Sequence, residues 1–469
     1  MPVRIGAEVD TVLRRYALTQ LLRLIGLTPR FNPAGEAVIH YGTQPVPRDR
    51  STIRIPADAE SLWQRQAPRV REVESVAVLH HGPPPSALRV GCSLTFDLVR
   101  AAAHWLTLES ETRVTRRDIH GRVPAAGSLL GRLGRLNRPP VNAYARLLDE
   151  MIRMRGFRFQ RSARWPYGRR YAVALTHDVD DPERPSPWEG IGLHILPLNA
   201  ESPRRAYWAL RTLARRGQAR ARRLRHAGLR PKWDFFRYAR LEHEYGFRSS
   251  FYFSVINRRG ASRFDVGYDI SRTRYRRLMR ALRREGWEIG LHASYETHLR
   301  NPSVGPQVRR LSTLLKRRVL GLRHHYLMLD PSRPLATLAE HARAGLLYDT
   351  SVGFNDAPGF RVGTALPFEP FDGAMHNHRR FVELPMTLSD MHLPRYHPRA
   401  AIDIVRRHLC AARECGGLAV LNWHVGNWLA APAWREAYRA ACRMLSLDSR
   451  VWVATPSEIA RWWLSDSGV

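Results

Sequence analysis

A chain of 469 residues is long enough for two or three domains, each with its own buried core. Its hydrophobic fraction of 44% excludes wholesale disorder, and no apolar run reaches the roughly 18 residues of a transmembrane helix. The formal net charge of +33 comes almost entirely from arginines spread along the chain, without a nucleic-acid-binding motif. A GC-rich genome explains such a composition, so we expect no nucleic-acid function.

The N-terminus and the cysteines bear on location. The first ten residues lack the apolar core and cleavage site of a signal peptide, so we expect a cytoplasmic protein. The four cysteines include no Cys-x-x-Cys pair. We therefore expect neither a disulfide framework nor a cysteine zinc site.

Residues 1–164 form the first predicted unit, a smaller α/β domain of unknown role. Apolar residues recur at helical spacing over residues 9–27. Further along, the patterns predict strands at 37–41, 51–55 and 77–79, and helices at 96–108 and 141–154. No catalytic constellation is visible here. Asp118 and His120 stand isolated, so a solvated or capping role is expected for each.

The pattern changes at residue 171, where apolar strands each end in polar residues and alternate with helices. The predicted strands are 171–176, 250–255, 287–292, 320–325, 418–424 and 451–454; the predicted helices are 275–285, 308–318, 334–344 and 398–414. Alternating strands and helices favour parallel pairing and a βα barrel, whose reactive groups lie at the carboxyl ends of the strands. We assign residues 165–469 to this barrel.

An arginine-dense helical stretch near 200–230 interrupts the barrel pattern after its first strand. A solvated helix face is the expected explanation. Peripheral contact with an anionic surface or substrate is the alternative.

Five polar clusters, one at each of five strand ends, are specific when taken together. They are Thr176-His177-Asp178-Val179-Asp180, Ser249-Ser250-Phe251-Tyr252-Phe253, Glu288-Ile289-Gly290-Leu291-His292, Gly321-Leu322-Arg323 and Leu421-Asn422-Trp423-His424. In this order they resemble the motifs of the polysaccharide deacetylases, that is, carbohydrate esterase family 4 with its nodulation-type deacetylase domain. The segment 348–361 is similar to a subgroup with an extra N-terminal α/β domain. The resemblance implies a distorted (β/α) barrel.

The resemblance also implies roles. Asp178 would be the general base, Arg323 its ion-pair partner and His424 the general acid. Asp180 and His292 would bind a divalent metal, zinc first, with Mn, Co, Ni or Fe as alternatives. Asp390 is a weaker candidate, expected to orient a neighbouring group.

The third metal ligand is where the sequence departs from the family. Glu296 stands where the usual histidine would be, and His298 follows two residues later. We rank His298 and Glu296 level, with His325, beside Arg323, behind them. If none of the three reaches the metal, the site would bind it weakly or lack it.

These residues predict a metal-dependent hydrolase that removes an acyl group, acetyl first, from an amino sugar, oligosaccharide or polysaccharide precursor. Two alternatives stay open. One is a deformylase or amidase acting on another C–N bond; the other is a non-catalytic protein of the same fold that binds a glycan or a membrane surface. The partner expected in the first case is a carbohydrate.

Overall fold

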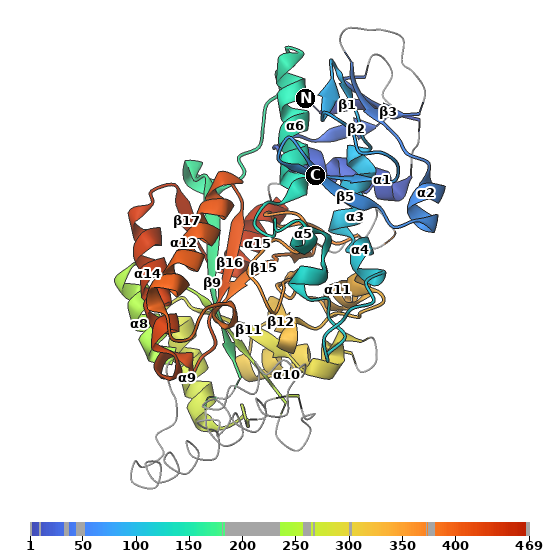
Figure 1. Cartoon of the computed structure of the whole chain (residues 1–469). Helices are drawn as coiled ribbons and strands as arrows, with labels where there is room; N and C mark the ends of the chain where they lie inside the picture. Colours follow the sequence, from blue (N-terminus) through green and yellow to red (C-terminus); the bar gives the residue numbers. More distant parts are fainter. Residues whose placement is uncertain are drawn as a thin grey trace, which may run out of the picture.

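The structure is a computed structural model, and the residues it describes are 2–8, 11–31, 37–43, 52–180, 182, 235–256, 264–265, 268–299, 303–371, 373 and 380–465. The arginine-dense stretch predicted at 200–230 lies outside them. Two bodies of secondary structure are visible in Figure 1, an N-terminal α/β part and a larger barrel.

The N-terminal part is built on a mainly parallel sheet. Its strands are β1 Val3–Ala7, β2 Pro29–Phe31, β3 Ile39–Gly42, β4 Ile53–Pro56, β7 Arg89–Val90 and β8 Ser93–Leu94, in the order β2-β1-β3-β4-β8-β7. Strands β5 Arg69–Val73 and β6 Val76–His80 form a separate antiparallel pair. The helices are α1 Val12–Arg23, α2 Glu60–Arg65, α3 Leu98–Leu106, α4 Glu109–Thr112, α5 Leu129–Arg132 and α6 Pro140–Met154. The predicted α/β character of this part is confirmed.

The barrel alternates strands and helices from residue 171 on. Its strands are β9 Tyr171–Val179, β10 Ser250–Phe253, β11 Glu288–Ala293, β12 Gly321–His324, β13 Tyr348–Asp349, β14 Val382–Glu383, β15 Met386–Ser389, β16 Leu418–Asn422 and β17 Val451–Val453. Its helices are α8 Phe235–Glu244, α9 Thr273–Arg284, α10 Gly305–Leu315, α11 Pro334–Arg343, α12 Pro398–Glu414, α13 Asn427–Ala430, α14 Pro432–Leu447 and α15 Pro456–Ser465.

Local sequence explains these elements. All nine residues of β9 are buried, as expected for a strand covered on both faces of a parallel sheet. Helix α9 buries Tyr275, Leu278, Met279 and Leu282, one stripe at helical spacing, whereas most of its arginines are exposed. Helices α6, α11, α12 and α14 all begin with proline, whose fixed φ suits the first helical position.

The parallel sheet curves into a distorted barrel. Its strands follow the order β14-β13-β12-β11-β10-β9-β16-β15, with β17 paired to the start of β9. The two end strands, β14 and β15, are separated in the chain only by Leu384 and Pro385. Three steps between Cα atoms, from Glu383 to Met386, span at most about 11 Å, so the edges of the sheet must lie close together. The predicted barrel is therefore confirmed, and its strands run round it in chain order.

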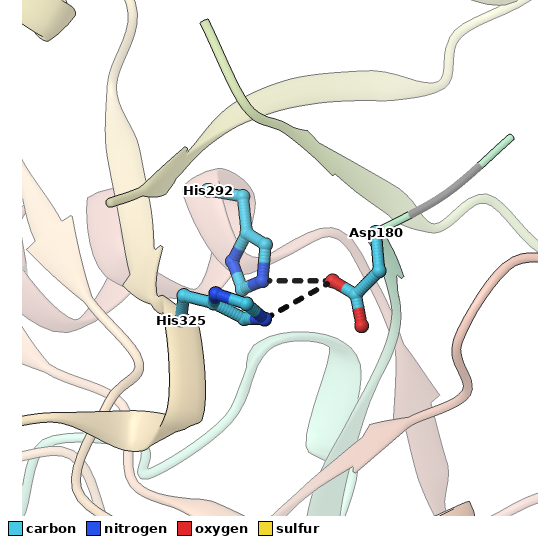
Figure 2. A group of neighbouring side chains, drawn as sticks. All are labelled: Asp180, His292 and His325. Atoms are coloured by element: carbon cyan, nitrogen blue, oxygen red, sulfur yellow. Dashed lines mark ion pairs between the residues drawn. The ribbon is translucent and has the colours of Figure 1, made fainter. Parts of the chain in front are cut away.

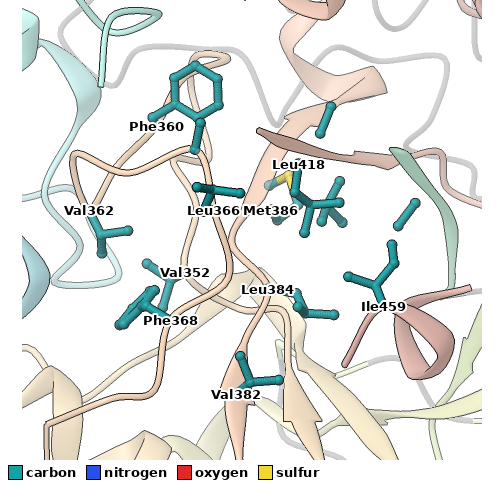
Figure 3. Close-up of a cluster of buried hydrophobic side chains, with 14 of the residues drawn as sticks. Val352, Phe360, Val362, Leu366, Phe368, Val382, Leu384, Met386, Leu418 and Ile459 are labelled. Carbon is teal, nitrogen blue, oxygen red and sulfur yellow. The ribbon is translucent and has the colours of Figure 1, made fainter. Parts of the chain in front are cut away.

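A buried apolar cluster supports this junction. Figure 3 shows Leu384 and Met386 from the junction beside Leu418 of β16 and Ile459 of α15. Its other labelled members belong mostly to the segment between β13 and β14: Val352, Phe360, Val362, Leu366, Phe368 and Val382. Because each of these side chains is at most 2% exposed, the long connection into β14 is part of the core.

The N-terminal part docks on the barrel through buried polar contacts. The Arg361 guanidinium binds the Glu111 carboxylate twice, at 2.9 and 2.6 Å. The Asn142 side-chain oxygen accepts from the amide of Ala365, and the Arg23 guanidinium donates to the carbonyl of Trp463 in α15. The two parts are thus tied together, and the division at residue 164 stays a prediction. Among the described residues, no helix combines the length and apolarity needed to cross a bilayer.

Candidate active site

The carboxyl ends of the barrel strands bring together most of the predicted site residues. Asp178 lies near the end of β9, and Asp180 follows it. His292 on β11 pairs in register with Arg323 on β12, and His325 comes directly after β12. His424 follows β16 and Asp390 follows β15, so seven residues from five strands meet at one rim.

A buried arginine holds Asp178. The Arg323 guanidinium, with no exposed side-chain surface, donates from NH1 to Asp178 Oδ1 at 3.0 Å. The Asn422 amide donates to the other Asp178 oxygen at 2.8 Å. Burial alone would raise the pKa of Asp178, but the charges of Arg323, His292 and His424 outweigh it and lower the pKa. Asp178 is therefore ionised and fixed in orientation.

The arginine is itself held by several acceptors. Besides Asp178, its guanidinium binds the hydroxyl of Thr176, the side-chain oxygen of Asn422 and both oxygens of Thr350. It also lies 4.9 Å from the centre of the Tyr252 ring. Sequence reasoning gave no role to Asn422, Thr176 or Thr350. Their place in the sequence could have indicated a role for two of them, because Thr176 and Asn422 stand inside the motifs. The two residues pair in register across β9 and β16.

Asp390 orients His424. The His424 Nδ1 lies 2.7 Å from Asp390 Oδ1, and the His424 backbone amide donates to Asp390 Oδ2. Its Nε2 faces both first-strand carboxylates, 3.9 Å from Asp178 Oδ2 and 3.8 Å from Asp180 Oδ2. Although burial disfavours the imidazolium, Asp390 and then Asp180 and Asp178 raise the pKa of His424 to about 10. The imidazole thus carries a proton at neutral pH and presents it toward the two carboxylates.

A second group of residues has the arrangement of a metal centre. One ligand-capable atom from each of Asp180, His292 and His325 lies within 4.8 Å of the others. Figure 2 shows both imidazoles turned toward the Asp180 carboxylate, with His292 Nε2 at 3.1 Å and His325 Nε2 at 3.9 Å from Oδ1. Two nitrogen or oxygen ligands of one zinc ion, each about 2.0–2.2 Å from it, lie about 3.3 Å apart. The spacing therefore suits one shared cation.

The hydrogen bonds of this group also fit a metal. The atoms Asp180 Oδ1 and His292 Nε2 are buried and have no further hydrogen-bond partner beyond their mutual contact at 3.1 Å. The His292 Nδ1 lies 3.0 Å from the carbonyl oxygen of Arg323, and the His325 Nδ1 lies 3.4 Å from Asp265 Oδ1. These acceptors hold the Nδ1 protons and leave each Nε2 lone pair for a cation, as in known metal centres. The donor set of two imidazoles and a carboxylate suits zinc and other first-row divalent metals.

The two residues ranked first as third ligand are not in this group. Residues Tyr295–His298 form a short 3₁₀ helix after β11, in which the His298 Nδ1 lies 2.6 Å from the carbonyl oxygen of Tyr295. Glu296 is exposed on the same turn. His325, ranked behind them, has the position of the third ligand. The order of the three candidates stays a prediction; the structure groups His325 with Asp180 and His292 because β12 lies beside β11 and ends at the same level.

His120 is not isolated, contrary to expectation. Its Nδ1 lies 3.1 Å from the hydroxyl of Tyr295, and its ring centre is 4.6 Å from that of Tyr326. Asp118 does have the expected capping role, since its carboxylate accepts from the amides of His120 and Arg122. No sequence signal could place His120 here, because its partners lie about 175 residues or more further along the chain.

Comparisons with known proteins give one family model and several similar solved structures. A family of unknown function, DUF7033, matches residues 8–156. No curated protein matches the sequence. Solved structures similar to the chain include a protein assigned as a polysaccharide deacetylase from Mycobacterium smegmatis, at 20% identity and a TM-score of 0.42, covering 65% of this chain and 93% of that one.

Two further structures are similar to the same degree. PuuE allantoinase is 17% identical and the probable polysaccharide deacetylase from Pseudomonas aeruginosa PAO1 is 16% identical. Each has a TM-score of 0.42 and covers 66% of this chain and 96% of its own. At these identities and TM-scores the likeness gives no information about the activity of this chain.

Proposed function

We propose that this chain is a metal-dependent hydrolase that removes an acyl group, acetyl first, from the nitrogen of an amino sugar in a saccharide or saccharide precursor. The observation that carries the proposal is the convergence of two imidazole nitrogens on one carboxylate oxygen: His292 Nε2 and His325 Nε2 lie 3.1 and 3.9 Å from Asp180 Oδ1. A carboxylate and two imidazoles at this spacing form a donor set that suits one divalent cation. The sequence motifs that resemble the deacetylases supply the substrate class.

Amide hydrolysis needs a base for the attacking water, an acid for the departing amine and stabilisation of the oxyanion. A divalent metal held by Asp180, His292 and His325 would lower the pKa of a bound water and polarise the acyl oxygen. Asp178, kept ionised by Arg323, would accept the proton of the attacking water. His424, kept protonated by Asp390, would donate its Nε2 proton to the leaving nitrogen.

The division of labour between the two carboxylates follows from their neighbours. Asp178 binds a guanidinium and an amide, which leave it little freedom, whereas Asp180 Oδ1 faces the imidazole nitrogens of His292 and His325. The first is suited to hold and release a proton, and the second to bind a cation. This arrangement favours catalysis over simple glycan binding, because binding a sugar requires no matched acid and base.

The test is acetate release. The full chain, stripped of metal by a chelator and then reloaded with zinc, would be incubated with N-acetylglucosamine oligomers, and free acetate measured against Asp178→Asn. We expect release that requires both the metal and Asp178. A folded, zinc-loaded protein that releases no acetate from these oligomers would contradict the proposed substrate, and formate release from N-formyl compounds would indicate the deformylase alternative.

A further inference from the structure

A turn of the N-terminal part, residues 118–122, is organised by one carboxylate. Asp118 Oδ1 accepts from the backbone amides of His120 and Arg122, each at 2.9 Å. Its Oδ2 accepts from Arg122 Nε at 2.8 Å, and the Asp118 amide donates to the carbonyl of Arg122. These bonds close the turn on itself. The position of His120 is therefore fixed by local structure.

The turn rests on the rim of the barrel. Arg122 NH1 donates to the carbonyl of Tyr326 at 2.7 Å, and its guanidinium lies 5.5 Å from the centre of the Tyr326 ring. The His120 ring centre is 4.6 Å from that of Tyr326, 5.1 Å from that of Phe264 and 5.6 Å from that of Tyr295. We call His120, Phe264, Tyr295 and Tyr326 the rim aromatic cluster. All four side chains are partly exposed.

This cluster is continuous with the candidate metal centre. Tyr326 follows His325 in the chain, and their ring centres are 4.6 Å apart. Asp265, which lies beside His325 Nδ1, also accepts from the backbone amide of Tyr295. Tyr326 adopts a left-handed φ of 60°, which a non-glycine residue adopts only at a cost that neighbouring contacts must offset. The contacts of Arg122 and His120 hold it in this conformation.

We propose that the N-terminal part completes the saccharide-binding surface and that His120 is a substrate-contacting residue. This inference rests on the proposed function. Partly exposed rings present apolar surface against which the C–H face of a pyranose can pack, while the Tyr295 hydroxyl and the Arg122 guanidinium offer polar groups to sugar hydroxyls. The occupant is the sugar next to the one that loses its acyl group, because the cluster adjoins His325 and does not contribute to the metal centre itself. The N-terminal part is thus a determinant of specificity.

The experiment measures binding separately from turnover. Tetrameric N-acetylglucosamine would be titrated calorimetrically into the full chain with its metal removed, so that the oligomer is not hydrolysed. The variants are His120→Ala, His120→Phe, which keeps a ring, and Arg117→Met. Arg117 is the matched control, since its guanidinium supports the same turn through the carbonyls of Glu111, Gly121 and Pro331.

We expect His120→Ala to weaken tetramer binding about fivefold, the loss of one aromatic contact, and His120→Phe to recover most of it. Arg117→Met should weaken it less than twofold. The same variants, loaded with zinc, should lose more kcat/KM for the tetramer than for 4-nitrophenyl acetate. The small ester cannot reach from the metal centre to the rim aromatic cluster, so its hydrolysis does not depend on His120.

Equal weakening by His120→Ala and Arg117→Met would overturn the proposal, because the turn would then only fasten the two parts together. Unchanged binding by His120→Ala, or no binding of the tetramer by the wild-type chain, would also overturn it. Tetramer binding that depends on His120 without acetate release by the zinc-loaded protein would support the rim aromatic cluster and contradict the hydrolase assignment. If the zinc-loaded wild type releases acetate but His120→Ala binds the tetramer as well as the wild type does, the hydrolase assignment is supported and the role of the rim aromatic cluster is contradicted.

Discussion

Two aspartates near strand ends of the two sheets, Asp97 buried and Asp180 partly buried, have opposite surroundings. Asp97, beside β3 and β4, accepts from three neutral donors: the Tyr41 hydroxyl and the amides of Asp58 and Arg100. Asp180, at the barrel rim, faces the imidazole nitrogens of His292 and His325 at 3.1 and 3.9 Å. Burial raises the pKa of Asp97 to about 6, whereas for Asp180 the imidazoles outweigh burial and lower the pKa. Burial alone therefore does not identify a functional carboxylate. The groups that face the carboxylate determine whether its pKa rises or falls.

The largest effect is expected for Asp178→Asn. The amide keeps the size of the side chain but cannot accept a proton, so kcat/KM for acetate release should fall by about 10³-fold, within the usual range for a general base. Circular dichroism and zinc binding of the variant would show that fold and metal remain. Retention of full activity would remove Asp178 from the chemistry.

The interface between the two parts can be tested by Glu111→Gln. This change leaves the Arg361 guanidinium, which is 7% exposed, without its charged partner, and such losses cost about 3–5 kcal/mol. Urea unfolding would measure the difference in the free energy of unfolding. Glu72→Gln is the control, since it breaks a half-exposed ion pair with Arg135 and should cost less than about 1 kcal/mol. Equal costs would mean that the docking contact is not important for stability.

The ligand set is tested by Asp180→Ala, His292→Ala and His325→Ala. Each should weaken zinc binding by roughly 100-fold or more, because even supporting residues of metal centres contribute about 10–100-fold. His298→Ala removes a histidine from the neighbouring turn and should leave zinc affinity within about threefold. Equilibrium dialysis with metal analysis would measure both. Loss of zinc in His298→Ala but not in His325→Ala would reverse the assignment of the third ligand.

The smallest effect concerns Asp97 and pH. Because its pKa is raised in the folded chain, its contribution to stability is fully present below about pH 4 and is lost as the pH rises through 6. The variant Asp97→Asn lacks this titration. The free energy of unfolding of the variant, relative to that of the wild type, should therefore rise by about 2 kcal/mol between pH 4 and pH 6 and then level off. Urea unfolding at a series of pH values would show it. A difference that does not change with pH would mean that Asp97 titrates normally.

The sequence was sufficient for the barrel, because strands that are buried on both faces and helices with one apolar stripe carry their own periodic patterns. Five of the predicted strands lie side by side at the predicted ends, and the catalytic candidates Asp178, Arg323 and His424 meet there. The sequence pattern did not predict the shortest strands. Strands β13 and β14 have two residues each and β1 has five, too few to show a period.

Contacts between distant segments were beyond the sequence. The position of His325, and not His298, beside Asp180 and His292 depends on the register of β11 against β12, and the place of His120 depends on how the N-terminal part docks. Both are set by packing of many residues far apart in the chain, for which a single sequence has no local signal. Asp265 was missed for the same reason, since it meets His325 from a different connection.

The most direct test of the central claim is a crystal structure of the full chain grown with zinc, in which anomalous scattering locates the ion. The account predicts one zinc bound by Asp180, His292 and His325 at about 2.0–2.2 Å, with Asp178 and His424 beside it and not bound to it. An ion held by other residues, or zinc-soaked crystals in which Asp180 and His292 hold no ion, would contradict it.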